Sequence, residues 1–130
     1  MNENAPSILV CLSQNFHNER ILREALRGVE EESVPYEILR QDKADDGVSL
    51  AYLGAGRSTL EVGIGLDENG CLAVHYRKLP PERPLFRIDY TREFKAIRSV
   101  CANAARLVKN TPFIEIKEGC GSADASTGPD

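Results

Sequence analysis

Residues 59–79, TLEVGIGLDENGCLAVHYRKL, contain two apolar, strand-like runs separated by a short polar turn. The turn includes Asn69 and Gly70, and the Asn-Gly dipeptide readily adopts the positive φ angles that a tight hairpin needs. We therefore expect strands at 59–67 and 71–79 that pair antiparallel. This hairpin constrains the fold most, because the remaining segments must cover an apolar pair of strands.

Two further strands and a helix precede the hairpin. The runs at 7–12, SILVCL, and 34–39, VPYEIL, predict strands. Between them, apolar residues recur at helical spacing and predict a helix over about 17–32. Its start could be capped by Asn15 or Asn18. The apolar stripe consists of Ile21, Leu22, Ala25, Leu26 and Val29.

A second helix is expected over 47–58, capped by Asp45 or Asp46 and ended or weakened by its glycines at 54 and 56.

The segment after the hairpin predicts a short extended piece at 85–90, and then the longest helix at 91–110. Thr91 is the candidate cap of that helix. Residues 112–116 could add a final edge strand.

The order strand, helix, strand, helix, strand, strand, helix predicts a single α/β domain over residues 1–118. We expect a three-layer arrangement with a mixed, mostly parallel sheet and helices on both faces. Its first three strands should be parallel through right-handed crossovers. Residues 119–130 have the composition of a disordered tail.

Charge and hydropathy exclude several partners. The net charge is −4, and the basic residues between 83 and 98 alternate with acidic ones, so we expect no nucleic acid and a solvated surface there. No apolar run approaches the ~20 residues of a membrane span. The first residues lack the pattern of a secretion signal, so a cytoplasmic protein is expected.

The sequence shows no pattern typical of a catalytic or nucleotide site. Its four cysteines form no C-x-x-C pair, and two histidines, His17 and His75, are not at metal-ligand spacing with them. The GIG at 63–65 lacks a third glycine and a following helix, so close packing explains it better than nucleotide binding. We predict no catalytic and no cofactor-binding residues, which favours a binding or scaffolding subunit.

Three consecutive glutamates, Glu30, Glu31 and Glu32, fall in the last turn of the first predicted helix. Negative charge is unfavourable there, because the unpaired carbonyls of a helix C-terminus are partly negative. Steps of about 100° place Glu32 nearest the edge of the apolar stripe and point Glu31 ~150° away from it. Taken locally, all three would keep the helix end soluble, with Arg27 offsetting Glu31.

Three segments together resemble a known family. GVEEESVPYEI, LEVGIGLDENGCLAVHYRKLPPERPLF and IRSVCANAARLVKNTPF are similar to the small subunit of the reactivating factor for adenosylcobalamin-dependent diol or glycerol dehydratases, over roughly residues 5–114. The resemblance implies a fold similar to the dehydratase medium subunit. It also implies a non-catalytic subunit of a chaperone-like complex, located in the cytoplasm or associated with a bacterial microcompartment.

The resemblance further implies partners. A large subunit would bind and hydrolyse ATP and form a heterotetramer with this chain. The complex would exchange subunits with an inactivated dehydratase, contacting the dehydratase large subunit, so that damaged cobalamin leaves. The family also supplies a carboxylate from the end of its first helix to a divalent metal, Mg²⁺ or Ca²⁺, held mainly by the large subunit. The matching position here is Glu31. Residues 72–86 and 103–109 are candidate contact or fold-defining segments.

Two alternatives stay open. The chain could be the medium subunit of the dehydratase itself, although such chains typically carry extra N-terminal sequence and coenzyme contacts. It could instead be a stand-alone α/β enzyme that binds a small molecule, which would require a polar pocket at the strand ends. In isolation, the orphaned interface could also produce a homodimer.

Overall fold

The structure is a computed structural model that describes residues 6–42 and 45–116. The described residues form five strands, three α-helices and one short 3₁₀ segment. In chain order these are β1 Ile8–Leu12, α1 Glu19–Glu31, β2 Tyr36–Arg40, α2 Gly47–Arg57, β3 Val62–Leu66, β4 Cys71–Tyr76, β5 Phe86–Asp89, the 3₁₀ segment Phe94–Ala96 and α3 Ile97–Lys109.

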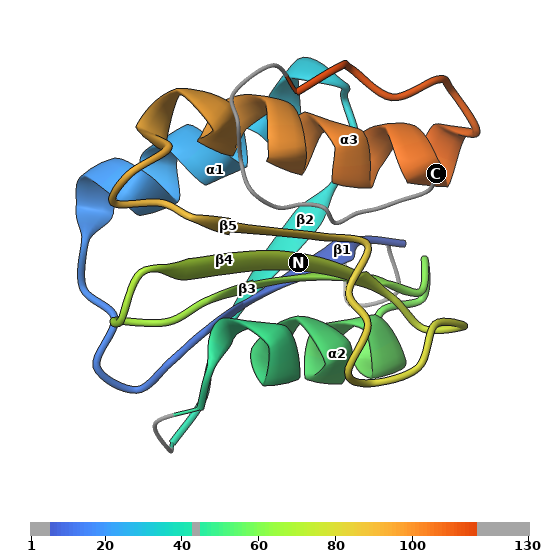
Figure 1. The fold of residues 1–130 in the computed structure, drawn as a ribbon. Helices are drawn as coiled ribbons and strands as arrows, with labels where there is room; N and C mark the ends of the chain where they lie inside the picture. The colour runs from blue at the N-terminus through green and yellow to red at the C-terminus, as the bar shows by residue number, and fades with distance from the viewer. Residues whose placement is uncertain (1–5, 43–44, 117–130) are drawn as a thin grey trace.

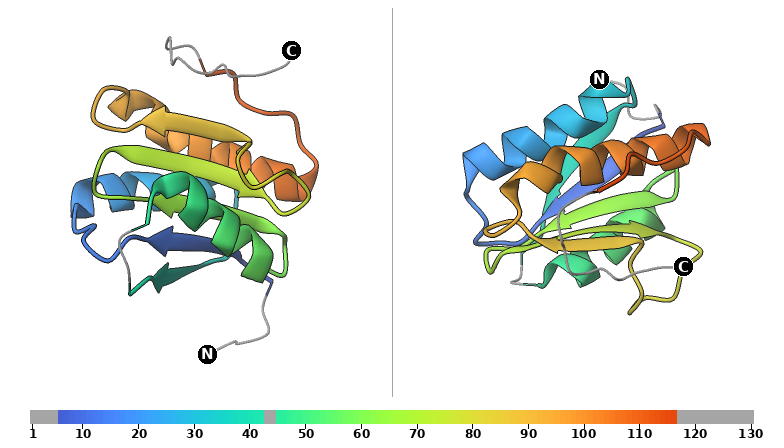
Figure 2. Two further views of the ribbon diagram at one scale, coloured as in Figure 1. Left: turned by 60° about the horizontal axis from the view of Figure 1, so that its bottom comes forward. Right: turned by 45° about the horizontal axis from the view of Figure 1, so that its top comes forward.

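The strands form one mixed sheet in the order β2-β1-β3-β4-β5. Strand β1 pairs parallel with β2 and β3, whereas β4 pairs antiparallel with β3 and β5. All strands except β4 therefore point the same way. Helices α1 and α3 cover one face of the sheet and α2 covers the other, as Figures 1 and 2 show. The predicted three-layer α/β fold is confirmed.

The hairpin between β3 and β4 forms as expected. Ile64 lies opposite Val74, and Gly70 has a φ of 108° in the turn. The Asp67 carboxylate organises this turn, because its Oδ1 accepts hydrogen bonds from the backbone nitrogens of Asn69 and Cys71, both at 2.9 Å. Its Oδ2 accepts another from the first residue of α2, the Gly47 nitrogen, at 2.8 Å. One buried carboxylate thus joins the hairpin to the start of a helix.

The two glycines of the VGIG segment face α2. A Cβ on Gly63 would clash with the backbone of Ala51 and Ala55, and one on Gly65 would clash with the backbone of Gly47 and Ala51. The helix therefore rests directly on the strand. This confirms that the glycines serve close packing.

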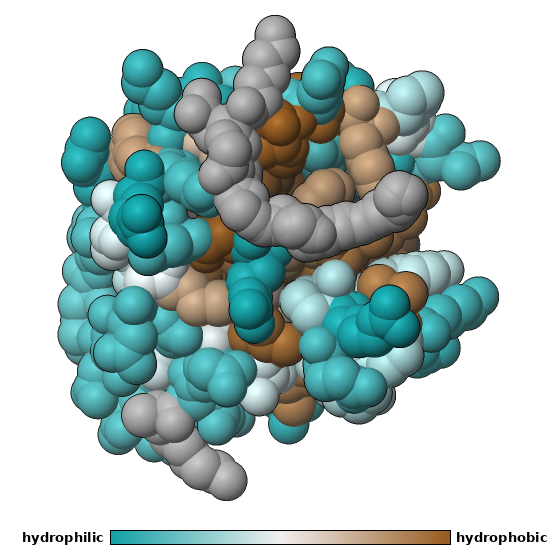
Figure 3. Space-filling model, viewed as in Figure 1, coloured by the Kyte–Doolittle hydropathy of each residue, from teal (hydrophilic) through white to brown (hydrophobic). Residues whose placement is uncertain are grey.

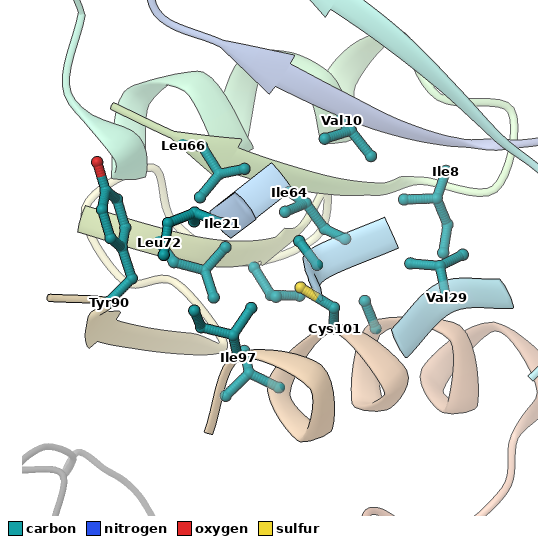
Figure 4. Close-up of a cluster of buried hydrophobic side chains, with 14 of the residues drawn as sticks. Ile8, Val10, Ile21, Val29, Ile64, Leu66, Leu72, Tyr90, Ile97 and Cys101 are labelled. Carbon is teal, nitrogen blue, oxygen red and sulfur yellow. The ribbon is translucent and has the colours of Figure 1, made fainter. Parts of the chain in front are cut away.

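The main core lies between the sheet and the helices α1 and α3 (Figure 4). Alternate residues of β1 and β3 point to this side, as do the inward faces of the two helices. The fully buried members include Ile8, Val10, Ile64, Leu66, Leu72, Val29, Ile97 and Cys101. The regular apolar spacing seen in the sequence thus becomes one continuous core.

Two of the proposed caps form. The side chain of Asn18 accepts a hydrogen bond from the Ile21 nitrogen at 3.1 Å, and Asp46 accepts one from Ser49 at 2.7 Å. Helix α2 continues past the glycines at 54 and 56 to Arg57, because Gly54 packs against β1 and β3. The expected bounds of 47–58 are confirmed to within one residue, and the helix ends one residue after Gly56.

The start of the last helix differs from the prediction. Thr91 does not cap it: the Thr91 nitrogen and hydroxyl both donate to Oδ1 of Asp89, at 3.0 and 2.6 Å. This local turn competes with helix formation. The chain then makes a 3₁₀ turn before α3 begins at Ile97.

Residues 112–116 are not a strand, contrary to expectation. The fully buried Asn103 of α3 binds both backbone groups of Ile114 instead. Its Nδ2 donates to the Ile114 oxygen at 3.0 Å, and its Oδ1 accepts from the Ile114 nitrogen at 2.6 Å. The backbone of Ile114 is therefore hydrogen-bonded to a side-chain amide of α3 and not to a neighbouring strand.

The predicted tail at 119–130 and the thiol of Cys120 lie outside the described residues. Among the helices that the structure describes, none is long and apolar enough to cross a membrane.

Candidate functional site: the end of the first helix

The three consecutive glutamates each find a different partner. The Glu30 carboxylate accepts a hydrogen bond from the Tyr36 hydroxyl at 2.8 Å. Oε2 of Glu31 accepts one from Nη1 of Arg98 at 3.1 Å. Glu32 forms ion pairs with Arg106 and Lys109. The interpretation that Glu30 and Glu32 only keep the helix end soluble was therefore wrong, because both make specific contacts.

Glu32 is the most embedded of the three, with 12% of its side chain exposed against 51% for Glu31. It forms ion pairs with Nε of Arg106 at 2.9 Å and Nζ of Lys109 at 2.7 Å. Hydrogen bonds from these two cations hold the pKa of the Glu32 carboxyl below its usual value. Lys109 also donates to the Glu32 backbone oxygen at 3.1 Å, at the carbonyl-rich end of α1.

The unfavourable charge at the end of α1 is therefore offset from another helix. Helix α1 has no basic residue in its last turn. Helix α3, which packs against α1, supplies three cations along the contact between the two helices: Arg98, Arg106 and Lys109. Cations near a helix C-terminus are stabilising. Local sequence could not reveal this, because the partners lie 67 to 77 residues further along the chain.

Helices α1 and α3 run in the same direction and lie side by side (Figure 2, right). Glu24 meets Arg98 and Glu32 meets Arg106 at the same sequence separation of 74 residues. Between these pairs, a Cβ on Gly28 would press against the backbone of Arg98 and Ala102. The glycine thus brings the helices close enough for the flanking ion pairs to form.

Glu31 is exposed, as its outward direction predicted. Arg27 does not offset it: Nη1 of Arg27 lies 3.8 Å from Oε1 of Glu24 instead. Arg98 takes that place. Oε2 of Glu31 accepts a hydrogen bond from Arg98, whereas Oε1 accepts none from the residues that the structure describes.

A carboxylate oxygen is the type of ligand that Mg²⁺ and Ca²⁺ prefer. In the described ranges 6–42 and 45–116, no cluster of three or more histidine, cysteine, aspartate or glutamate side chains could hold a metal. Glu31 could supply one oxygen ligand, but no complete site of this kind forms around it within those ranges.

His75 is fully buried and structural in its contacts. Its Nε2 lies 3.0 Å from the Pro81 oxygen, and its ring packs edge-on against Tyr52 with centroids 5.0 Å apart. The Leu85 nitrogen also bonds to the Val74 oxygen at 2.8 Å. The proline-rich loop within 72–86 is thus anchored to β4.

Arg40, the last residue of β2, reaches across to the loop that follows β1. Nη1 of Arg40 donates to the backbone oxygens of Ser13, Gln14 and Phe16, at 3.1, 3.4 and 2.6 Å. This contact leaves the guanidinium engaged with the chain itself.

The described cysteines are poor nucleophiles. Burial raises the pKa of the Cys11 and Cys71 thiols to about 11. Burial also raises the pKa of Cys101. At neutral pH all three therefore remain thiols, and the thiolate is the reactive form.

An open hollow of about 1160 Å³ lies between the start of α2, the hairpin turn and β5. Two of its carboxylates are engaged locally, since Asp46 caps α2 and Asp89 binds Thr91. Arg87 and Arg92 also line the hollow, so its wall carries both signs of charge.

Apolar residues gather toward the centre of the face shown in Figure 3, with hydrophilic residues around them. Two large apolar side chains of the described chain are exposed, Ile38 at 47% and Phe113 at 44%. Ile38 lies on the edge strand β2, and Phe113 packs against Phe86 of the opposite edge strand β5, with ring centroids 5.3 Å apart. Ile38 and Phe113 therefore lie near opposite edges of the sheet and do not belong to one exposed apolar patch.

Comparison with protein families gives a match to the dehydratase medium subunit over residues 5–114. The chain is 37% identical over 115 residues to the propanediol dehydratase-reactivating factor small subunit of Salmonella typhimurium, covering 88% of this chain and 96% of the relative. It is 37% identical over 115 residues to the diol dehydratase-reactivating factor small subunit of Klebsiella michiganensis, covering 88% and 89%. A probable glycerol dehydratase-reactivating factor small subunit of Citrobacter freundii is 37% identical over 118 residues, covering 90% and 100%.

Two solved structures are similar throughout. A glycerol dehydratase reactivase chain superposes with a TM-score of 0.80 at 33% identity, covering 85% of this chain and 97% of that one. A chain of the diol dehydratase-reactivating factor complexed with ADP and Mg²⁺ superposes with a TM-score of 0.77 at 37% identity, covering 86% and 100%.

Proposed function

The chain belongs to the dehydratase medium subunit family, and we propose that it acts as the small subunit of a diol or glycerol dehydratase-reactivating factor. The observation that carries this conclusion is the 37% identity to a propanediol dehydratase-reactivating factor small subunit, in a match that covers 96% of that relative. A small subunit implies a larger partner.

The reactivating complex would work by subunit exchange. A chain with the medium subunit fold can compete for the surface that the medium subunit occupies on a dehydratase, because mass action favours whichever subunit binds better. The small subunit would leave its large partner and displace the medium subunit of an inactivated enzyme. The opened enzyme would then release its damaged cobalamin.

The chemical step of this cycle, ATP hydrolysis, is assigned to the large subunit. The raised pKa of the Cys11 and Cys71 thiols argues against either of them as a catalytic nucleophile. The relative solved with ADP and Mg²⁺ is consistent with nucleotide in the complex. The small subunit contributes shape and contacts.

Glu31 would contribute to the contact with the large subunit. Its exposed carboxylate supplies one oxygen ligand, and the partner supplies the rest of the shell around Mg²⁺ or Ca²⁺. A divalent cation shared in this way would link the two subunits and offset the negative charge of Glu31.

The medium subunit of the dehydratase remains the second candidate, because the family match carries that name. The two functions differ in the partner that is bound stably. The small subunit should form a lasting complex with the reactivase large subunit and only a transient one with the dehydratase large subunit.

Co-purification tests this proposal. The tagged chain is expressed with the reactivase large subunit and, separately, with the dehydratase large subunit, in Mg²⁺ and in chelator. We expect stable capture of the reactivase subunit, weakened by chelator and by Glu31→Ala. Glu37→Ala, a change of an exposed glutamate on β2, should leave capture unchanged. Stable capture of the dehydratase subunit instead would overturn the assignment.

A further inference from the structure

Arg98 connects the exposed Glu31 to a more enclosed carboxylate. It lies in the first turn of α3 and bonds to two residues of α1 that are seven positions apart, Glu24 and Glu31. Sequence alone had placed Arg98 in a solvated basic cluster. The structure gives it a specific place next to the proposed metal ligand.

The contact with Glu24 fixes the plane of the guanidinium. Nε and Nη2 of Arg98 donate to the two carboxylate oxygens of Glu24, at 2.9 and 3.1 Å. Such a bidentate pair defines orientation as well as distance. The Glu24 side chain is 15% exposed, so the anchor of this pair sits largely inside the seam between α1 and α3.

The remaining terminal nitrogen of Arg98, Nη1, bonds to Glu31. With the guanidinium held by Glu24, Nη1 donates to Oε2 of Glu31 at 3.1 Å. One oxygen of Glu31 is therefore held and the other stays available. The exposed side chain, 51% accessible, would otherwise sample several rotamers and lose this freedom on binding.

We propose that Arg98, oriented by Glu24, is a positioning residue that holds the Glu31 carboxylate ready for a divalent cation at the subunit interface. The inference rests on the proposed metal-binding role of Glu31. Hydrogen-bonded partners of a ligating carboxylate orient it, and their removal typically lowers metal affinity by about 10- to 100-fold. Arg98 would act entirely through Glu31.

The test measures association with the reactivase large subunit across a Mg²⁺ titration and in chelator. In Arg98→Met, which keeps the apolar stem, we expect the Mg²⁺ concentration for half-maximal strengthening to rise by about 10-fold. Affinity in chelator should match the wild type. Glu24→Gln and Arg98→Lys should give intermediate shifts, because each weakens the bidentate pair.

Two controls isolate the role. Glu61→Gln removes an ion pair that lies outside the contact between α1 and α3, the one to Arg77, and should leave the Mg²⁺ dependence unchanged. In the double variant Glu31→Ala/Arg98→Met, the Mg²⁺ response should equal that of Glu31→Ala alone. A merely structural role would instead weaken association equally in Mg²⁺ and in chelator, and lower the melting temperature.

Each contrary result has one meaning. If Glu31→Ala abolishes the Mg²⁺ response but Arg98→Met leaves it unchanged or makes it more sensitive, the positioning role is wrong and the metal role stands. If Glu31→Ala retains the wild-type response, the metal role is wrong and the positioning role falls with it. Loss of association in every condition for the wild type would refute the subunit assignment itself.

Discussion

Gly28 of α1 and Ala102 of α3 lie in contact, because a Cβ placed on Gly28 would come within 2.9 Å of the Ala102 backbone nitrogen. They share the separation of 74 residues that also joins Glu24 to Arg98 and Glu32 to Arg106. The helices therefore meet in register, with small residues at the centre and ion pairs on either side. This register places Arg98 beside Glu31 at the exposed end of α1.

The first prediction concerns this close approach. Gly28→Ala should lower the free energy of unfolding by about 1–3 kcal/mol, since the added methyl group meets the backbone of α3. Gly56→Ala on α2 is the matched control, because an added Cβ there meets no other part of the described chain within 4 Å and alanine favours helix by up to ~1 kcal/mol. Urea denaturation should give opposite signs. Equal stabilisation by both changes would refute the close approach of α1 and α3 at Gly28.

The second prediction concerns pH. Bonds from Lys109 and Arg106 lower the pKa of Glu32 in the folded protein below its ordinary value of 4.5. The ion pairs therefore stabilise the fold above that value, and this stabilisation is lost as the pH falls through the lowered pKa. At pH 7, Glu32→Gln should be less stable by up to ~1 kcal/mol. The difference should close in acid.

Thermal unfolding at several pH values checks this, with Glu37→Gln as the control. Glu37 is exposed on β2 and has no ion pair within the described ranges. A difference between wild type and Glu32→Gln that persists unchanged into acid would contradict the role assigned to these ion pairs.

The third prediction concerns the segment after α3. Asn103→Leu removes both hydrogen bonds to the Ile114 backbone, each worth about 1 kcal/mol. Hydrogen exchange at the Ile114 amide should accelerate strongly, while amides of β3 change little. Thr111→Val, which alters an exposed and longer contact, serves as the control. Unchanged protection of Ile114 would show that the Asn103 side chain does not hold this segment.

Local patterns predicted most of the fold, because strands, helices and the hairpin depend on neighbouring residues. Apolar spacing identified the face of α1 that is buried, and Asn69-Gly70 identified the turn. The errors arose where another part of the chain decides the outcome. Asp89 binds Thr91, so α3 begins later in the chain than expected. Asn103 bonds to the backbone of Ile114, within the segment 112–116 where a strand was expected.

In the candidate site, too, local features could be predicted from the sequence and contacts with distant parts of the chain could not. Helical geometry correctly pointed Glu31 outward, since direction around a helix is a local property. The partners of Glu30, Glu31 and Glu32 depend on how β2 and α3 pack against α1, which the spacing of α1 does not encode. Arg98 was therefore missed, although its position four residues before Ala102 and eight before Arg106 follows one helix face.

Reactivation of an inactivated dehydratase tests the central claim most directly. A diol or glycerol dehydratase inactivated with its damaged cobalamin bound is incubated with ATP, Mg²⁺ and fresh coenzyme, and its activity is followed over time. The account predicts recovery with the large reactivase subunit and this chain together, and none with either subunit by itself. Recovery that is the same with and without this chain would contradict it.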